Sequence, residues 1–188
     1  MKSIFIYKPN FLSIEETNTL QAYLDLLSFK KGECQREQLW FQKDKRYFCE
    51  NWYKRIDRWK SQPYYPSFLI SLEQKLNVLL DSYPEIPTPK LNSCLINKYN
   101  TGNDYIRPHS DSSFSFGEFP TIINLSIGAP RYIELKKNST GEISKQLLES
   151  GSIFIMAGSS QKEFTHSIPK CDNCSNVRYS LTFREYKI

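Results

Sequence analysis

The sequence lacks an apolar run of the roughly 18 residues that can span a bilayer, so no transmembrane helix is expected. Lys8, Pro9 and Asn10 interrupt the first apolar stretch too early for the core of a secretory signal, so no such signal is expected. Cysteines number five, an odd count that argues against a secreted disulfide framework and favours a reducing intracellular compartment. Hydrophobic and charged fractions of 39% and 24% are typical of a globular chain. We therefore expect one intracellular, monomeric domain over residues 1–188, without a membrane partner.

Histidine is also scarce, with only two copies, His109 and His166. The first belongs to the sequence His109-Ser110-Asp111. Residues two apart in an extended segment point to the same face, so His109 and Asp111 should project together, with His166 reaching them from another strand. Two imidazoles and one carboxylate can hold an iron ion and leave its other positions open. The alternative is a surface histidine that happens to lie beside a carboxylate.

Positive charge is concentrated in one part of the chain. Residues 30–60 hold ten Lys and Arg against five acids, so this window carries the whole net charge of +5. It also holds all three tryptophans, and cations interleaved with aromatic rings suit a nucleic-acid strand. Residues 50–60 favour a helix that buries Trp52, Ile56 and Trp59. Residues 36–48 show no regular period and favour a substrate loop, although their rings could instead form a small satellite core.

The pattern of elements changes near residue 90. A strand is predicted over 2–7, and helices over 14–29, after a capping box at Ser13, and 67–83. Beyond residue 90, short β-rich segments recur at 91–99, 121–127, 131–136, 143–148, 152–157 and 177–186. We predict an α+β fold, a double-stranded β-helix (jelly roll) over 91–188 supported by N-terminal helices, with residues 1–90 supplying that support and a lid.

The segment from Arg178 to Arg184 is the second chemically informative motif. Alternation along a strand places Arg178, Ser180, Thr182 and Arg184 on one face. Buried guanidinium groups need anionic partners, and a dicarboxylate ligand would supply two. The alternative is an edge strand whose arginines are solvated.

These motifs resemble the AlkB-like iron(II)/2-oxoglutarate dioxygenases. The resemblance rests on the following segments: Asn97-Lys98-Tyr99, His109-Ser110-Asp111, Pro120 through Arg131, Gly151-Ser152 with Met156, His166-Ser167-Ile168-Pro169, Arg178 through Arg184, and, upstream, Arg36 through Phe41.

The resemblance implies a role for each matching residue. Fe(II) would be held by His109, Asp111 and His166. The co-substrate 2-oxoglutarate would be bound by Asn97, Tyr99, Arg178, Ser180, Thr182 and Arg184. The nucleic-acid substrate would meet Arg36, Trp40, Phe41, Tyr47, Phe48, Ser113 and Arg131. In that family O2 converts 2-oxoglutarate to succinate while an N-methyl carbon on a base is hydroxylated and lost as formaldehyde.

Two positions depart from the family pattern. The motif R-x-N-x-T-x-R has Ser180 where asparagine stands, and we expect an asparagine introduced there to be tolerated. Members that repair bases usually carry an acid four residues after the first histidine, where this chain has the neutral Ser113. The second departure leaves the identity of the base open.

We therefore predict oxidative demethylation of N-alkylated bases in single-stranded or flipped-out DNA or RNA. The alternatives are a 2-oxoglutarate oxygenase that hydroxylates a protein side chain or small molecule, and a non-catalytic nucleic-acid-binding module. Cys171 and Cys174 form a C-x-x-C without a second pair for a zinc site, so we expect ordinary loop thiols.

Overall fold

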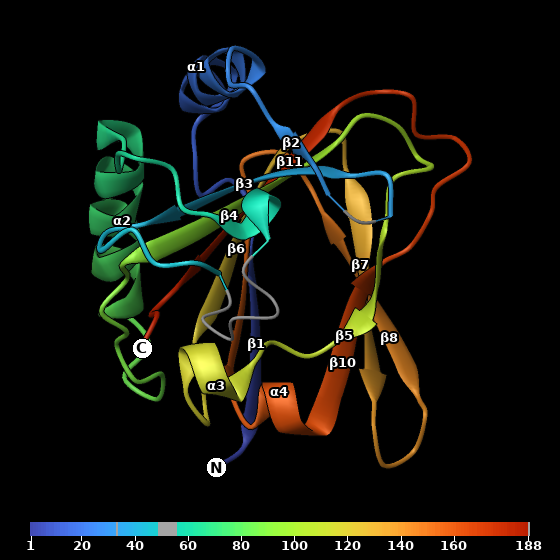
Figure 1. The fold of residues 1–188 in the computed structure, drawn as a ribbon. Helices are drawn as coiled ribbons and strands as arrows, with labels where there is room; N and C mark the ends of the chain where they lie inside the picture. Colours follow the sequence, from blue (N-terminus) through green and yellow to red (C-terminus); the bar gives the residue numbers. More distant parts are fainter. Residues whose placement is uncertain (33, 49–55, 188) are drawn as a thin grey trace.

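Two antiparallel β-sheets face each other in the computed structural model, which describes residues 1–32, 34–48 and 56–187 (Figure 1). The larger sheet has the strand order β1-β9-β6-β11-β4-β3-β2, and the smaller has the order β5-β10-β7-β8. This arrangement confirms the predicted α+β class and jelly-roll architecture.

The elements follow one another along the chain as β1 (Ser3–Lys8), α1 (Ile14–Asp25), β2 (Lys30–Lys31), β3 (Glu37–Gln42), a 3-10 turn (Asp57–Trp59), α2 (Ser67–Leu80), β4 (Ser93–Tyr99), β5 (Ile106–His109), α3 (Ser113–Phe116), β6 (Ile122–Gly128), β7 (Arg131–Lys137), β8 (Ile143–Leu148), β9 (Ile153–Gly158), α4 (Ser160–Glu163), β10 (Phe164–Ile168) and β11 (Arg178–Arg184). None of the helices in this described part of the chain is long and apolar enough to cross a membrane.

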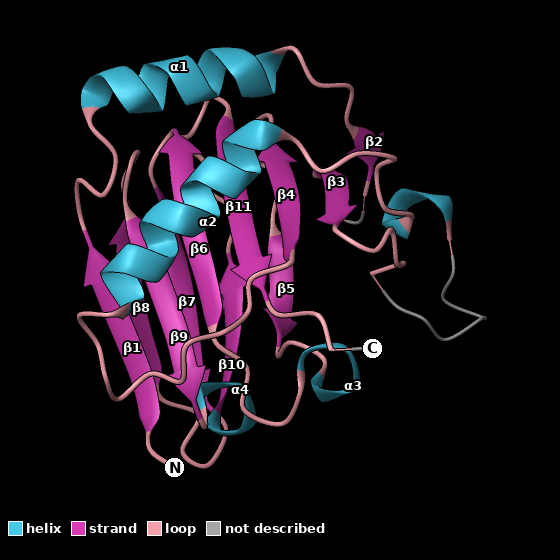
Figure 2. Ribbon diagram, turned by 90° about the vertical axis from the view of Figure 1, so that its left-hand side faces the viewer, coloured by secondary structure: helices cyan, strands magenta, loops and turns pink. Residues whose placement is uncertain are grey.

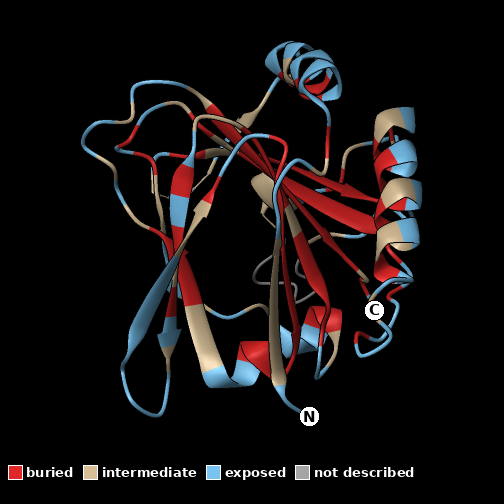
Figure 3. Cartoon of the chain, turned by 180° about the vertical axis from the view of Figure 1, so that it is seen from behind, coloured by how far each residue is buried: buried red, intermediate tan, exposed pale blue. Residues whose placement is uncertain are grey.

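The outer face of the larger sheet is covered by α1 and α2, as Figure 2 shows. The capping box is present, since the side chains and backbone N–H groups of Ser13 and Glu16 bond reciprocally and start α1. Leucines of both helices pack on the outward residues of β11, among them Tyr179, Leu181 and Phe183. Figure 3 shows this burial along the strands behind the helices. The residues of β11 that point toward the helices are therefore part of the hydrophobic core.

The inner face of β11 faces the smaller sheet. Apolar residues from both sheets, such as Phe154 and Met156 of β9 with Ile133 and Leu135 of β7, fill part of the space between them. The strand register determines which polar residues share this face. On one side of β11, Ser180 lies opposite Asn97 of β4. It lies opposite Ser126 of β6 on the other. Directly opposed residues of antiparallel strands point the same way, so polar side chains gather at one place.

The N-terminal ninety residues contribute strands as well as helices. β1 pairs with β9, and β3 pairs with β4 inside the larger sheet. The prediction of irregular backbone over 36–48 is therefore wrong for residues 37–42. The sequence Glu37-Gln-Leu-Trp-Phe-Gln lacks polar alternation because both of its faces are buried, and such a strand shows no period-2 signal.

Two further predictions need correction. The predicted helix over 50–60 lies in part, including Trp52, outside the described residues. Its end is a single 3-10 turn, in which Trp59 is only half-buried. Cys171 and Cys174 form a disulfide, not two separate thiols. Their loop is held to Gly102 by backbone hydrogen bonds, and this proximity brings the two residues together.

Candidate active site

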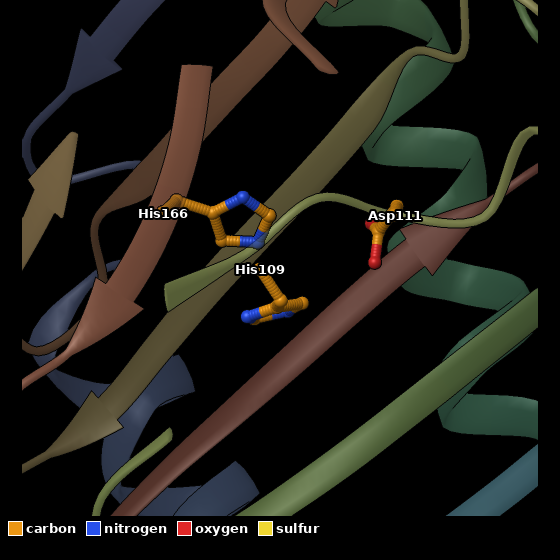
Figure 4. A group of neighbouring side chains, drawn as sticks. All are labelled: His109, Asp111 and His166. Atoms are coloured by element: carbon orange, nitrogen blue, oxygen red, sulfur yellow. The ribbon is translucent and has the colours of Figure 1, made fainter. Parts of the chain in front are cut away.

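The two histidines lie directly opposite each other on neighbouring strands. His109 ends β5, and it pairs in register with His166 of β10. Side chains of such a pair share one face, and the two ring centroids lie 4.3 Å apart. Nδ1 of His109 donates a hydrogen bond to the Arg107 carbonyl at 2.8 Å, which leaves Nε2 free to bind a metal ion. Figure 4 shows both imidazoles converging on one space.

Asp111 approaches this space from the segment that follows β5 (Figure 4). Its backbone N–H donates to the side-chain oxygen of Gln161 at 2.9 Å, which fixes the segment. One ligand atom from each of His109, Asp111 and His166 can be chosen so that all lie within 4.8 Å of one another. Strand pairing and one hydrogen bond thus assemble three residues separated by up to 57 positions.

Arg184 holds the carboxylate of Asp111 through a two-pronged ion pair. Its Nε donates to Oδ2 at 2.8 Å and its Nη2 to Oδ1 at 3.1 Å. Both side chains are about 95% buried. This ion pair takes up two N–H groups of the guanidinium, and Arg184 also lines the cavity described below, so its contact with a carboxylate of the co-substrate stays a prediction. Arg184 positions a metal ligand.

The surroundings of the cluster shift the pKa values of its side chains. Burial alone would raise the pKa of Asp111, but the Arg184 guanidinium and the two imidazoles outweigh it and hold that pKa at about 2. Burial, with His109 and Arg184 nearby, lowers the pKa of His166 to about 3. A carboxylate that is ionised and an imidazole that is neutral at pH 7 are the protonation states that metal binding requires.

A cavity of about 340 Å³ opens beside the cluster, within the usual size range of small-molecule sites. Five of the six residues predicted to bind the co-substrate line it: Asn97, Tyr99, Ser180, Thr182 and Arg184. All of them lie on the inner faces of β4 and β11, as the alternation predicted for β11. The cavity therefore brings the metal cluster and these polar residues together.

Arg178, the sixth, lies behind this lining. It is fully buried, its carbon Cζ is 5.1 Å from the centroid of the Tyr99 ring, and its Nη2 donates to Ser126 Oγ at 3.0 Å. Its Nε and Nη1 have no hydrogen-bond partner among the described residues. Burial lowers the pKa of this guanidinium to about 10. A buried cation with unused N–H groups is costly, and an anionic group beside Tyr99 would give such a group an acceptor.

The substrate residues predicted on β3 need correction. Trp40 and Phe41 are 0% and 1% exposed, and neither lines the cavity. The Trp40 indole N–H donates to the Arg46 carbonyl at 2.8 Å, while Phe41 packs beneath the helices in the core. Both rings are structural: Trp40 belongs to a small separate cluster, which is the satellite-core alternative that the sequence left open, whereas Phe41 belongs to the main core.

Three more predicted substrate residues lie outside the cavity lining. Arg131 is buried and donates to the carbonyls of Thr101, Asp104 and Pro169, so it ties two loops together. Ser113 is exposed at the start of α3, and Tyr47 is half-buried.

The remaining two predicted substrate residues line the cavity. Phe48 is half-buried there, and Arg36 donates from Nε to Asn97 Oδ1 at 3.0 Å.

Several cavity residues were missed from the sequence. Gln38 is 1% exposed, and its Oε1 has no partner among the described residues. Trp59 lines the cavity beside Phe48, with ring centroids 5.5 Å apart. Asn124 of β6 also lines it. Asn124 could have been found from its spacing of two from Ser126 within a strand, whereas Gln38 and Trp59 carry no such signal.

A jelly roll that holds a His-x-Asp…His cluster beside a polar cavity defines a metal-dependent class of β-protein in which the metal keeps open positions. The chain belongs to the 2OG-Fe(II) oxygenase superfamily, whose family model matches residues 5–184. This membership implies Fe(II), 2-oxoglutarate and O2 as metal, co-substrate and oxidant, and the triad fits it.

Relatives confirm the AlkB-like resemblance. The chain is 31% identical over 133 residues to the DNA oxidative demethylase ALKBH2 of Arabidopsis thaliana, covering 58% of this chain and 42% of that protein. It is 27% identical over 192 residues to the human alpha-ketoglutarate-dependent dioxygenase alkB homolog 3, covering 94% and 64%. The chain thus spans less than two thirds of these relatives' length. The structure of OsALKBH1 shares the fold, with a TM-score of 0.67 at 17% identity over 96% of this chain and 97% of that one.

Proposed function

We propose that this protein is an Fe(II)- and 2-oxoglutarate-dependent dioxygenase that oxidatively demethylates N-alkylated bases in DNA or RNA. The observation that carries the proposal is the cluster of His109, Asp111 and His166 at a cavity whose wall holds hydrogen-bonding groups and aromatic rings. The names of the relatives, one of them a DNA oxidative demethylase, support the choice of substrate. Residues from both sides of position 90 line the cavity, so we take residues 1–188 as one catalytic domain.

In this proposal the three clustered residues bind Fe(II), and Arg184 keeps the Asp111 carboxylate ionised and oriented. The bound metal, with O2 and 2-oxoglutarate, supplies the oxidising equivalents for hydroxylating an N-methyl carbon, with succinate and carbon dioxide as co-products. Tyr99 and Asn97 line the co-substrate's place. The unused donors of Arg178 pair with the carboxylate far from the metal, because they are buried donors that still need an acceptor.

The base would stack on the aromatic wall formed by Phe48 and Trp59. Both rings are half-buried and face the cavity, and each stacked base gains roughly 1–3 kcal/mol. That gain offsets the cost of extruding a base, a few kcal/mol in a duplex and less in a single strand. We therefore propose a single-stranded or flipped-out base as substrate, bound by a monomer.

One observation favours the runner-up, hydroxylation of a protein side chain or small molecule. Among the described residues that line the cavity, Asp111 is the only acid, and Arg184 already neutralises it. Ser113 lies outside the lining, so no carboxylate there meets the positive charge of an alkylated base. A cavity without a free carboxylate suits a neutral protein side chain or small molecule, and among bases it suits neutral methylated ones.

A panel of singly methylated oligonucleotides, both cationic and neutral, tests the proposal. Each is incubated with Fe(II) and 2-oxoglutarate and read by mass spectrometry. We expect loss of the methyl group from at least one member, abolished in Asp111→Ala and retained in the control Asp172→Ala, which alters an exposed loop acid. Succinate release without demethylation of any member would favour the runner-up, and no turnover of 2-oxoglutarate would refute both.

A further inference from the structure

The carboxamide of Asn124 occupies the space beside Ser180. Asn124 Nδ2 lies 2.6 Å from Ser180 Oγ and 3.2 Å from Thr182 Oγ1. Asn124 comes from β6, the strand next to β11, where it lies directly opposite Thr182. Position 180 is the one place where the β11 motif departs from R-x-N-x-T-x-R. An amide is therefore present at this place in the cavity, although β11 does not supply it.

Asn124 also links Arg178, at one end of the β11 motif, to the hydroxyls of Ser180 and Thr182. Arg178 Nη2 donates to Ser126 Oγ at 3.0 Å, and Ser126 Oγ donates to Asn124 Oδ1 at 3.4 Å. The amide of Asn124 then donates to the hydroxyls of Ser180 and Thr182. One carboxamide thus connects the buried guanidinium to both hydroxyls of β11.

This network leaves two hydroxyl protons for a ligand. A hydroxyl offers one donor and two acceptor lone pairs, and the oxygens of Ser180 and Thr182 are both engaged as acceptors by Asn124. Both residues line the cavity, so their O–H groups can donate into it. A ligand that carries carboxylate or keto oxygens and no donors is the chemical complement of such a wall.

We propose that Asn124 is a positioning residue for 2-oxoglutarate, which supplies from β6 the amide that β11 lacks. It orients the hydroxyls of Ser180 and Thr182 toward the ligand and holds Ser126 against Arg178. The inference rests on the proposed function in taking 2-oxoglutarate as the ligand. The alternative is a purely structural role, in which the amide only satisfies the hydrogen-bonding needs of buried hydroxyls. In that case the affinity for 2-oxoglutarate would not depend on whether β6 or β11 carries the amide.

An exchange between the two strands tests the assignment. Asn124→Ser removes the amide, and Ser180→Asn adds a second amide where Nδ2 already lies 2.6 Å from the hydroxyl oxygen. We expect each single variant to weaken 2-oxoglutarate binding by about fivefold to tenfold, as much as one net hydrogen bond between neutral groups contributes, because the hydroxyls that meet the ligand are then no longer oriented. The double variant, with the amide on β11 and the hydroxyl on β6, should return to within about twofold of wild type.

Affinity is measured by calorimetry of 2-oxoglutarate binding to protein loaded with Mn(II), a redox-inert stand-in for Fe(II). Mn(II) affinity and the melting temperature are measured alongside. Asn138→Ser, on the turn after β7, is the matched control and should leave 2-oxoglutarate affinity unchanged. If Asn124→Ser does not fold, Asn124→Thr takes its place, because it is neutral and suits a strand, and it should bind 2-oxoglutarate more weakly because it loses both N–H donors.

The outcomes separate this inference from the proposed function. Unchanged affinity in the Asn124 variants, or a double variant that binds no better than the weaker single one, overturns the role of Asn124 while wild type still binds. Absence of 2-oxoglutarate binding in Mn(II)-loaded wild type overturns the proposed function itself. Recovery of 2-oxoglutarate affinity in the double variant supports the inference. A structural role does not predict that two substitutions which each weaken binding restore it when combined.

Discussion

Replacing Arg184 by Met should lower the stability of the protein, and a bound metal ion should restore part of that stability. The guanidinium makes two hydrogen bonds to Asp111, at 2.8 and 3.1 Å, with both side chains almost fully buried. Removing one partner of a buried ion pair leaves an uncompensated charge and costs about 3–5 kcal/mol. For a domain of this size that corresponds to a loss of roughly 6–20 °C in melting temperature.

The loss should depend on metal. In EDTA the Arg184→Met protein carries an unpaired Asp111 carboxylate, whereas bound Mn(II) gives that carboxylate a new counter-charge. We therefore expect a large deficit in the melting temperature in EDTA and a smaller one in Mn(II). Adding Asp111→Asn to Arg184→Met should recover much of the loss, because both buried charges are then gone.

Lys162→Met, which breaks the exposed ion pair with Glu118, is the control and should cost under about 1 kcal/mol. If metal-free Arg184→Met melted within about 2 °C of wild type, a change under about 1 kcal/mol, the pair would not hold Asp111 as described.

Three further predictions follow from other parts of the molecule. Arg178→Lys keeps the charge but loses the fork of donors, so the Kd for 2-oxoglutarate in calorimetry should rise at least about tenfold with Mn(II) affinity unchanged. Phe41→Ala should cost about 3–5 kcal/mol in denaturant unfolding and spare oligonucleotide binding, whereas Phe48→Ala should weaken that binding by about 1–3 kcal/mol in fluorescence anisotropy; the reverse pattern would restore the lid. Burial lowers the pKa of His166 to about 3 in the native protein, whereas an unfolded histidine has a pKa near 6.5. Between these values His166 binds a proton in the unfolded chain and not in the native protein. The metal-free protein should therefore lose stability from about pH 6 to 4, by up to about 1.4 kcal/mol per pH unit from this residue, and His166→Gln should show a shallower slope.

Much of the site could be predicted because it rests on a spacing of two residues. Alternation along β11 placed Ser180 and Thr182 on the cavity face and Leu181 in the core, as the structure shows. The β11 prediction succeeded because side-chain direction in a strand is a local property of the backbone. His109 and Asp111 also come together, but Asp111 lies past the end of β5 and is held by Gln161 and Arg184.

What could not be predicted depends on partners distant in sequence. Trp40 and Phe41 looked like exposed rings because nothing local shows that β3 is covered on both faces. Only the fold shows that Arg184 forms a buried ion pair with Asp111, because the two residues are 73 positions apart. Tolerance of asparagine at Ser180 stays a prediction, and only the fold shows that an amide from β6 already lies beside this position.

The central claim is that the cluster of His109, Asp111 and His166 couples 2-oxoglutarate turnover to demethylation of a base. It is tested most directly by counting succinate and formaldehyde in one reaction with a single methylated oligonucleotide and Fe(II). We predict equal amounts of the two products in wild type and neither in His166→Ala, with the variant still folded by its melting profile in EDTA. Formaldehyde released without succinate, or equal yields from His166→Ala and wild type, would contradict the claim.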